Sequence, residues 1–370
     1  MNYKLFTSES VAAGHPDKIC DQVSDAILDA ALREDTNSRV AVETMVTKNR
    51  VFIAGEVTCK SKLNYTNIAK ATISKLGYTK GEFNFGSNSP IDIYVHEQSP
   101  QISHGVEAGG AGDQGMVFGY ATNETKQLMP APIAIAHLLV EKLDSLRETR
   151  KLNYLYPDGK SQVTVSYEEG SPIRVENVVM AVAASSKLGR GQLKNDLLRL
   201  LIRPVLDEFG YKISESRVII NGAGENWTTP GPQSDTGVTG RKIVVDTYGG
   251  QARVGGGCFS GKDPTKVDRS GAYATRYIAK NIVAQGLADK AEVQIAYAIG
   301  QRRPVAFSIE TFGTEKTKLT SIEKFAKDLI DLSVPGILDS LKLRSPIYQR
   351  TAAYGHFGRD IFPWENVEQM

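Results

Sequence analysis

Hydrophobic residues at one-turn spacing predict a long helix near the beginning of the chain. Ile19, Val23 and Ile27 recur every four residues, the spacing that places side chains on one face of a helix. Pro16 suits the first turn, because its missing N–H would have no helical partner there. The pattern therefore predicts a helix over residues 16–34, which begins within the stretch AAGHPDKICDQ.

A second stripe on the same predicted helix is acidic. Its members also recur every four residues and are Asp17, Asp21, Asp25 and Asp29. The positive end of the helix dipole would stabilise Asp17 and Asp21, which lie near the N-terminus of the helix. We expect Asp25 and Asp29 to lie on a solvated face, as charged residues at helical spacing usually do.

Two alternating segments follow this helix and predict a β-hairpin. RVAVETMVT (39–47) and RVFIAGEVT (50–58) alternate apolar and polar residues, which is the pattern of half-buried strands. They are separated by Lys48 and Asn49, the length of the commonest hairpin turn. A helix near residues 65–76 completes this first unit.

The turn length of the hairpin determines where its two glutamates lie. With a two-residue turn, Glu43 faces Ala54 and Glu56 faces Ala41. The two glutamates then lie diagonally on one face of the hairpin, roughly 7–8 Å apart. A three-residue turn would send them to opposite faces, so this inference depends on the register.

The order helix, strand, strand, helix returns twice more along the chain. The second unit is predicted to contain a helix over 131–149, strands over 161–167 and 176–184, and a helix over 192–208. The third unit is predicted to contain a helix over 266–286, strands over 292–300 and 304–313, and a helix near 321–332. This repeat of element order predicts an α+β protein of three similar units, each a mostly antiparallel sheet covered by helices.

Composition and charge exclude several classes of protein. A net charge of +2 gives no overall attraction to nucleic acid or to a membrane surface. No apolar run approaches the roughly 18 residues of a membrane-spanning helix, and the N-terminus lacks the apolar region of a signal peptide. Cys20, Cys59 and Cys258 lie far apart without a CxxC pair, which argues against zinc sites and disulfides. These features predict a protein of the reducing cytoplasm.

Candidate chemistry is concentrated in the glycine-rich stretch 235–270. Its cations are Arg241, Lys242, Lys262, Lys266 and Arg269. Backbone N–H groups of glycine turns can approach an anion closely, and lysines add point charges. Asp263 and Asp268 lie among these cations, and proteins usually hold Mg²⁺ through one or two carboxylates together with phosphate oxygens. An isolated charged turn would be solvated, but this clustering predicts a metal–polyphosphate site.

A P-loop is disfavoured within the same stretch. The residues from Gly256 to Lys262 satisfy the spacing G-x-x-x-x-G-K. The next position is Asp263, however, where a P-loop requires Ser or Thr to bind the metal. A P-loop phosphotransferase is therefore the weaker interpretation.

Three other features are less specific. YPDGKSQ (156–162) contains Asp158 and Lys160, and its Pro-Asp-Gly sequence predicts a turn. The glycine-rich segment 105–120 predicts a hinge, a lid or a surface that a ligand contacts. The histidines that lack any metal-ligand spacing are expected to be structural, and they are His96, His104, His137 and His356.

Five long motifs together carry a resemblance to a known family. They are GHPDKICDQVSDAILDA, GAGDQGMVFGYA, DGKSQV, DTGVTGRKIVVDTYGG and FSGKDPTKVDRSGAYATRYIAKNIV. In this order the chain resembles the methionine adenosyltransferase (S-adenosylmethionine synthetase) family over essentially its whole length. The resemblance implies three interleaved α+β domains related by a pseudo-threefold, over residues 1–100, 111–229 and 231–370, with a gating loop over 98–113.

The activity implied by the resemblance is the synthesis of S-adenosylmethionine from ATP and L-methionine. The methionine sulfur attacks C5′ of ATP and expels the triphosphate, which is then hydrolysed to pyrophosphate and phosphate. Mg²⁺, two ions per site, and K⁺ assist. The site lies between the subunits of a homodimer, and the resemblance leaves open whether dimers pair into tetramers. A thioether is a neutral nucleophile, so orientation and charge stabilisation replace a general base.

The resemblance also implies roles for individual residues. The catalytic group comprises His15, Lys160, Lys262 and Lys266. Residues matching ATP contacts are His15, Asp158, Lys160, Asn226, Trp227, Asp235, Arg241, Lys242, Cys258 and Lys262. Those matching methionine contacts are Glu56, Gln98, Asp235 and Lys266. The metal ligands are Asp17 and Asp268 for Mg²⁺ and Glu43 for K⁺.

Three departures from the family pattern affect these expectations. The segment NGAGENWTTPGPQSD (221–235) is one residue longer than usual, so that Trp227 replaces the usual aromatic and Asn226 stands where Arg is expected. Cys258 replaces a small apolar residue, and we expect the site to tolerate this change because a free cysteine packs as a small hydrophobic residue. The loop 98–115 is several residues shorter than usual, which bears on closure of the site.

A different class of function is the main alternative. The chain would then be a non-catalytic, nucleotide-binding regulatory homologue that pairs with an active partner. Loss of an expected catalytic or metal residue would favour that interpretation, yet Asp17, Lys160, Lys262 and Asp268 are all present. The sequence therefore favours the enzyme.

Overall fold

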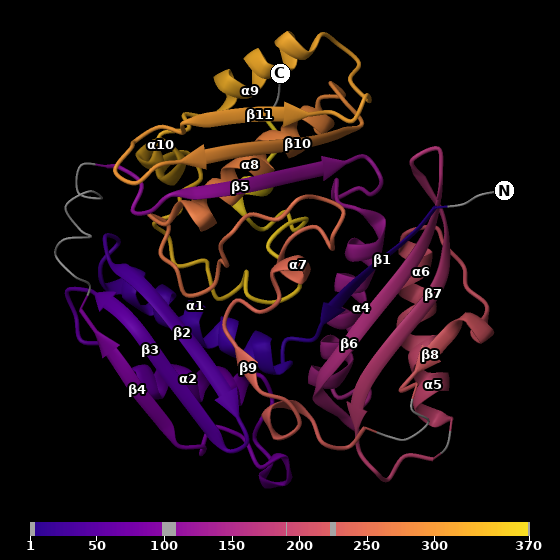
Figure 1. The fold of residues 1–370 in the computed structure, drawn as a ribbon. Coiled ribbons are helices and arrows are strands. Elements are labelled where there is room, and N and C mark those ends of the chain that lie inside the picture. The colour runs from indigo at the N-terminus through magenta and orange to yellow at the C-terminus, as the bar shows by residue number, and fades with distance from the viewer. Residues whose placement is uncertain (1–3, 98–108, 190, 223–226, 369–370) are drawn as a thin grey trace.

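The computed structural model describes residues 4–97, 109–189, 191–222 and 227–368. Three β-sheets, each accompanied by helices, surround a central region in which the short helix α7 (Ile243–Asp246) lies (Figure 1). Strand pairing is antiparallel except between β3 and β4 and between β7 and β8. The predicted α+β fold of three interleaved units is confirmed.

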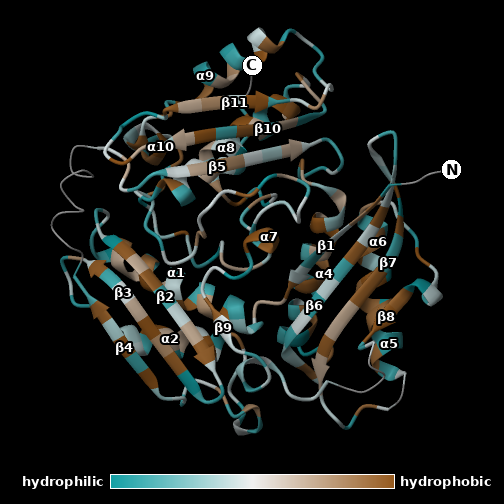
Figure 2. Cartoon of the chain, viewed as in Figure 1, coloured by the Kyte–Doolittle hydropathy of each residue, from teal (hydrophilic) through white to brown (hydrophobic). Residues whose placement is uncertain are grey.

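The first sheet has the strand order β4-β3-β2-β9. Its strands are β2 (Arg39–Thr47), β3 (Arg50–Thr58), β4 (Ile91–His96) and β9 (Gly237–Val238). The hairpin register is the one predicted, with Glu43 opposite Ala54 and Glu56 opposite Ala41. Apolar and polar residues alternate along β2 and β3, so that the sheet buries one side against the core (Figure 2).

The helices of the first unit also match their predicted positions. They are α1 (Pro16–Glu34) and α2 (Tyr65–Lys75), followed by a 3₁₀ turn over Gly81–Phe83. Helix α1 packs against β2, β9 and α2. Nearly every residue of α1 is buried, the polar ones included. This helix is therefore an internal element with protein on all sides.

The second sheet has the order β1-β6-β7-β8. Its strands are β1 (Lys4–Val11), β6 (Leu155–Glu168), β7 (Ser171–Ala184) and β8 (Val218–Ile220). Its helices are α4 (Ala131–Glu148), α5 (Gln192–Leu197) and α6 (Arg203–Glu208), with a π-helical turn over Leu198–Ile202 and a 3₁₀ turn over Glu215–Arg217. The predicted Pro-Asp-Gly turn is wrong, because these residues lie in β6, where Lys160 pairs with Val11 of β1.

The third sheet has the order β11-β10-β5. Its strands are β5 (Gly115–Thr122), β10 (Lys290–Tyr297) and β11 (Ala306–Glu310). The helices of this unit are α8 (Val267–Ala284), α9 (Leu319–Leu329) and α10 (Val334–Ser340), with 3₁₀ turns over Gly231–Gln233 and Pro363–Glu365. Helix α8 packs on β5 and β10.

Each sheet includes a strand from a distant part of the sequence. Strand β1 joins the sheet of β6 and β7, β5 joins that of β10 and β11, and β9 joins the hairpin of β2 and β3. These three strands interleave the units. Among the described residues, no helix is both long and apolar enough to cross a membrane.

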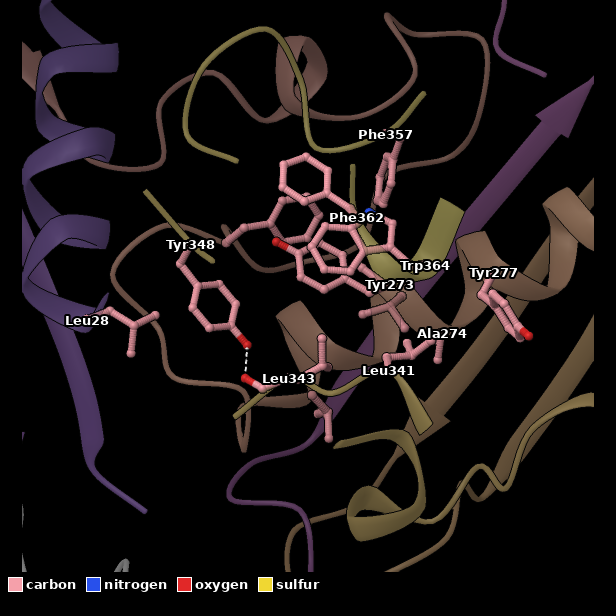
Figure 3. Close-up of a cluster of buried hydrophobic side chains, with 14 of the residues drawn as sticks. Leu28, Tyr273, Ala274, Tyr277, Leu341, Leu343, Tyr348, Phe357, Phe362 and Trp364 are labelled. Carbon is pink, nitrogen blue, oxygen red and sulfur yellow. Dashed lines mark hydrogen bonds between the residues drawn. The ribbon is translucent and has the colours of Figure 1, made fainter. Parts of the chain in front are cut away.

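Aromatic side chains from the end of the chain fill the space next to α8 (Figure 3). The indole ring of Trp364 stacks on Tyr273 with centroids 3.7 Å apart, and Phe362 stacks on Trp364 at 4.8 Å. The guanidinium of Arg269 lies over the ring of Tyr348 at 4.3 Å. The C-terminal segment is therefore a structural part of the core, and it lies against the helix that follows the cation-rich stretch.

His137 on α4 is buried and structural, as predicted, and it should make stability depend on pH. Its Nδ1 lies 2.8 Å from Ser10 Oγ. Burial, with the charges of Arg359 and Lys18, lowers the pKa of His137 to about 3. Because the unfolded chain takes up this proton near pH 6.5 and the folded chain does not, acidification stabilises the unfolded state.

We therefore expect His137→Asn to weaken the acid sensitivity of folding. Between pH 7.5 and pH 5, the free energy of unfolding of the wild type should fall by about 2 kcal/mol more than that of the variant. Chemical denaturation across this pH range measures the difference. His96→Asn, at a side chain that is 70% exposed, is the control and should follow the wild type. Parallel curves for the wild type and His137→Asn would contradict the prediction.

Candidate active site

The first turn of α1 is built so that an imidazole lies at its N-terminus. His15 is the N-cap residue, and its Nδ1 accepts a hydrogen bond from the N–H of Asp17 at 3.2 Å. Gly14 is required because a Cβ there would lie 2.0 Å from the carbonyl oxygen of Pro157 on β6. The close approach of two units thus sets the position of His15.

The His15 side chain is neutral at physiological pH. Burial, followed by the charges of Lys242 and Lys160, lowers its pKa to about 3. Because Nδ1 accepts the N–H of Asp17, the proton of the neutral ring lies on Nε2. An imidazole in this state can donate one hydrogen bond to an anionic oxygen without itself being charged.

Asp17 links α1 to two cations of the glycine-rich stretch. Its Oδ1 accepts the N–H of Val238 at 3.0 Å, and its Oδ2 accepts from Lys242 Nζ at 2.5 Å. Arg241 Nε lies 3.6 Å from the same carboxylate. Burial alone would raise the pKa of Asp17, but the hydrogen bonds from Lys242 and Val238 outweigh it and lower the pKa. Asp17 therefore remains ionised and places these cations beside His15.

The expectation that Asp25 and Asp29 lie on a solvated face is wrong. Both are buried, as are Asp17 and Asp21. The third unit covers this side of α1 and leaves backbone N–H groups pointing at it. A period of four residues indicates a face of the helix but not what covers that face.

The four aspartates of α1, here called the aspartate ladder, receive backbone N–H groups from the third unit. Beyond the bond to Asp17, Asp21 accepts from Gly240 at 2.8 Å and Asp25 from Gly261 at 2.9 Å. Asp29 accepts from both Tyr348 and Gln349, at 2.8 and 3.0 Å. The residue after Gly240 is Arg241 and the residue after Gly261 is Lys262, so the ladder fixes both cation-bearing loops on one helix.

Lys18 supports the ladder from within the core, a role that the sequence did not predict. Its side chain is fully buried and donates to Asp21 at 2.9 Å and also to Asp246 of α7. Burial would lower the pKa of Lys18, but the two carboxylates reverse this and raise it. The neighbouring aspartates at helical spacing were the available signal, because a lysine between them could pair with one.

A second group of charged side chains lies around Lys262. Its Nζ donates to Asp268 Oδ2 on α8 at 2.6 Å. The backbone of Lys262 also forms an isolated antiparallel β-bridge with Ala41 of β2, which brings Lys262 beside Glu43 of the hairpin. Partial burial and the like charge of Glu56 raise the pKa of Glu43, although Lys262 acts in the opposite direction.

Cys258 joins the two groups. A Cβ on Gly240 would lie 2.6 Å from the Cβ of Cys258, so the two loops are in direct contact. Burial raises the pKa of the Cys258 thiol, and Lys262 and Asp268 are near enough to influence it. The thiol is thus a protonated, half-buried packing group between the two sets of cations.

Lys266 and Asp263 form a local ion pair that explains why the P-loop pattern fails. Lys266 donates to Asp263, whose carboxylate also accepts the N–H of Val40 at 2.7 Å and the hydroxyl of Thr265 at 2.6 Å. Asp263 is buried and fixes the loop to β2. It occupies the P-loop metal position but acts as a loop anchor.

Asp158 and Lys160 lie on β6, close to the first turn of α1. Asp158 is buried, and its Oδ2 accepts the N–H of Gly231 at 2.8 Å. Burial raises its pKa to about 7, although the Gly231 N–H and Lys160 act in the opposite direction. Lys160 is exposed, and its charge is one of those that lower the pKa of His15.

The remaining predicted site residues differ in how well they are placed. The backbone of Trp227 forms a parallel β-bridge with Ala183, near the C-terminal end of β7. The indole N–H of Trp227 donates to the carbonyl of Thr229 at 2.7 Å. Asp235 is exposed, one residue before Thr236 in the loop that leads to β9. Gln98, Asn226, His104 and most of the predicted gating loop lie outside the described residues.

The structure thus assembles most of the predicted cations around α1. Within the described residues, no cluster of three or more His, Cys, Asp or Glu side chains has the arrangement of a metal site. The carboxylates that face the cations, Asp17 and Asp268, are each paired with a lysine. A surface with a neutral imidazole and several cations held in place by carboxylates is suited to binding a polyphosphate.

Comparison with known proteins gives consistent matches along the whole chain. The N-terminal domain of S-adenosylmethionine synthetase matches residues 3–100, its central domain residues 108–226 and its C-terminal domain residues 229–366. A curated relative, the S-adenosylmethionine synthase of Desulforudis audaxviator (strain MP104C), is 48% identical over 382 residues. The match covers 99% of this chain and 96% of the relative.

Proposed function

We propose a mechanism for this chain, which belongs to the S-adenosylmethionine synthetase family and synthesises S-adenosylmethionine. In the proposed reaction the methionine sulfur attacks C5′ of ATP. The S–C5′ bond forms as the C5′–O5′ bond breaks, and its electron pair leaves with the triphosphate. The triphosphate is then hydrolysed to pyrophosphate and phosphate. The observation that carries this proposal is the ion pair of Asp17 with Lys242 beside a neutral His15.

The residues at the first turn of α1 would bind the triphosphate end of ATP. His15 would donate its Nε2 proton to the oxygen next to C5′, where negative charge grows as the bond breaks. Lys160, Arg241 and Lys242 would neutralise the remaining charge. The contacts of Arg241 and Lys242 with Asp17 support this assignment, because a preorganised cation needs no rearrangement when the charge develops. Asp158 would stay near the nucleotide, held by Gly231.

The charged group around Lys262 would complete the site. We assign Lys262 to the triphosphate and Lys266 to the junction of ATP and methionine, although Lys266 is tied to Asp263 in the structure described here. Cys258 would line the ATP side of the loop. Methionine would be held through its amino group by Glu56, with Gln98 and Asp235 nearby.

Mg²⁺ and K⁺ are proposed as the cofactors, two Mg²⁺ ions to a site. Asp17 and Asp268 are carboxylates among the cations proposed to bind the triphosphate, which fits Mg²⁺ because this ion is commonly bound by one or two carboxylates with phosphate oxygens. The pKa of Glu43 is raised by burial and by the like charge of Glu56. A monovalent cation bound there would relieve the repulsion between these two carboxylates. When bound, the metal ions would neutralise charge on the triphosphate.

We also propose that the enzyme is a cytoplasmic homodimer with its sites between subunits. Exposed apolar side chains on the first sheet support a protein partner: Met45 and Ile93 are each 37% exposed, and Tyr94 is 67% exposed. The three cysteines are free, which supports a reducing compartment. Pairing of dimers into tetramers would be a further step.

The proposed role of Trp227 is to stack on the adenine ring. Trp227→Ala should weaken ATP binding by roughly 1–3 kcal/mol, the scale of stacking between a base and an aromatic side chain. Equilibrium binding of ATP measures this loss. A substitution at Trp364, the other tryptophan, is unsuitable as a control because Trp364 is a core residue. Phe312→Ala, at an aromatic side chain that is 47% exposed and lies away from the first sheet, serves instead. Unchanged ATP affinity in Trp227→Ala would remove Trp227 from the nucleotide site.

Incubation of the purified chain with ATP, L-methionine, Mg²⁺ and K⁺ tests the proposed reaction. Mass spectrometry should detect S-adenosylmethionine, and ³¹P NMR should detect pyrophosphate and phosphate in equal amounts. Accumulation of tripolyphosphate would contradict the proposed second step. ATP binding without any product would favour the non-catalytic regulatory homologue.

A further inference from the structure

We propose that this protein has a second anion site, a pocket of about 240 Å³ that binds a small oxyanion such as phosphate. The pocket lies between α2, the C-terminal end of α4 and the segment 349–359, so that all three units contribute to its wall. Its cations are Lys75, Arg350 and Arg359. None of these residues belongs to the proposed ATP or methionine site.

The lining of the pocket carries a net positive charge. Glu148 is the one acid in its lining, and that carboxylate is 3.1 Å from Arg147, which lies outside the lining. Across the described part of the chain, no carboxylate lies within ion-pair distance of Lys75, Arg350 or Arg359. Three cations around one concave surface repel one another, and a bound anion would relieve that repulsion.

Arg359 is the cation least accessible to water. Its Nη2 donates to the carbonyl oxygens of Arg350 and Gly355, each at 2.8 Å, and its guanidinium lies over the ring of Phe362 at 4.7 Å. Its Nε is buried and has no hydrogen-bond partner. Burial lowers the pKa of Arg359 to about 10, although Glu141 acts in the opposite direction from beyond ion-pair distance. A half-buried guanidinium that has no carboxylate partner is costly, and an oxyanion would offset that cost.

The size and lining of the pocket define the class of ligand. Its volume is below the range of roughly 300–1,000 Å³ that encloses drug-sized molecules. The neutral polar side chains in the wall belong to Gln22, Thr72, Gln349 and Tyr354. A guanidinium offers paired N–H donors that match the oxygens of phosphate, and Lys75 adds a point charge. A small phosphate-like anion fits better than a whole nucleotide.

The wall of the pocket is connected to the start of α1. The hydroxyl of Tyr354 donates to Asp144 Oδ2 at 2.9 Å, and the same oxygen accepts the N–H of Ala13 at 2.9 Å. Ala13 also lines the pocket, two residues before His15.

Isothermal titration with inorganic phosphate tests the proposed site. The double variant Lys75→Gln/Arg350→Gln changes two exposed cations, and it should weaken phosphate binding at this pocket at least tenfold while binding at the proposed ATP site remains. Arg203→Gln/Lys324→Gln makes the same change in charge at exposed positions elsewhere and should bind as the wild type does. Lys160→Gln/Lys262→Gln alters only the proposed ATP site and should leave one phosphate bound. Circular dichroism checks that each variant is folded.

The outcomes separate the two sites. Loss of phosphate binding in Lys160→Gln/Lys262→Gln but not in Lys75→Gln/Arg350→Gln would overturn the proposal, as would the absence of any binding to the wild type. A parallel titration with AMP distinguishes the source of the anion. Binding of phosphate without AMP would identify a free oxyanion, and equal displacement of phosphate by AMP would identify the phosphoryl group of a larger molecule.

Discussion

Asp17→Asn should lower the turnover number of S-adenosylmethionine synthesis by about 10²- to 10³-fold. The carboxylate holds Lys242 and Arg241 beside His15, and the substitution removes its charge while preserving its shape. Loss of a preorganised charge contact at the leaving group costs on the order of 2.7–4 kcal/mol in the transition state. Because Asp17 does not belong to the proposed methionine contacts, the KM for methionine should change far less. Steady-state kinetics at saturating and at limiting Mg²⁺ measure both quantities.

The same substitution at other positions supplies the comparison. Asp268→Asn should behave similarly, because Asp268 holds Lys262 as Asp17 holds Lys242. Asp339→Asn, at an exposed position on α10, should leave turnover unchanged. Full turnover of Asp17→Asn at limiting Mg²⁺ would exclude Asp17 from the metal site, and a rise in the KM for methionine alone would move it to another role.

Asp25→Asn should destabilise the fold by about 3–5 kcal/mol. Asp25 accepts two hydrogen bonds from the fully buried Arg269, at 2.7 and 2.8 Å, as well as the N–H of Gly261. The substitution leaves a guanidinium buried without a carboxylate, which is far more costly than losing an exposed ion pair. Trp364 reports the change, because it stacks on Tyr273, to which Arg269 donates a hydrogen bond. Urea denaturation followed by tryptophan fluorescence gives the free energy of unfolding.

An exposed pair provides the matched control for Asp25. Asp92→Asn removes a carboxylate 3.1 Å from Arg50 on the surface and should cost at most about 1 kcal/mol. A combined Asp25→Leu/Arg269→Met variant should recover part of the stability, because it leaves no unpaired charge. If Asp25→Asn unfolded at the same urea concentration as the wild type, the ladder would not contribute to the stability of the fold.

The elements that the sequence predicts well are those with local signals. Helix α1 begins at a proline after an N-cap residue, and β2 and β3 alternate around a two-residue turn, so both depend on neighbours in the sequence. The hairpin register followed from the turn length and correctly placed Glu43 and Glu56 on one face. These features needed no knowledge of the remaining chain.

Elements that depend on distant partners could not be predicted in the same way. Strand β9 has only two residues and exists because it pairs with Met45 and Val46 of β2. The Pro-Asp-Gly sequence favours a turn, but pairing of Lys160 with Val11 draws it into β6. Tertiary pairing outweighs local propensity at both places.

The candidate site shows the same division. Clustering of cations and glycines indicated an anion site, whereas the individual roles came from the family resemblance. Neither source indicated that Asp21 and Asp25 are buried anchors for the loops that carry Arg241 and Lys262. An acidic stripe looks alike whether water or backbone N–H groups face it, so only the packed structure distinguishes the two cases.

The central claim is that the cations gathered around α1 hold the triphosphate, and equilibrium binding of inorganic tripolyphosphate tests it without the chemical step. We predict that Lys242→Gln and Lys262→Gln each weaken binding at least tenfold, while Trp227→Ala leaves it unchanged because no adenine is present. Equal affinity of the wild type and both lysine variants would contradict the account.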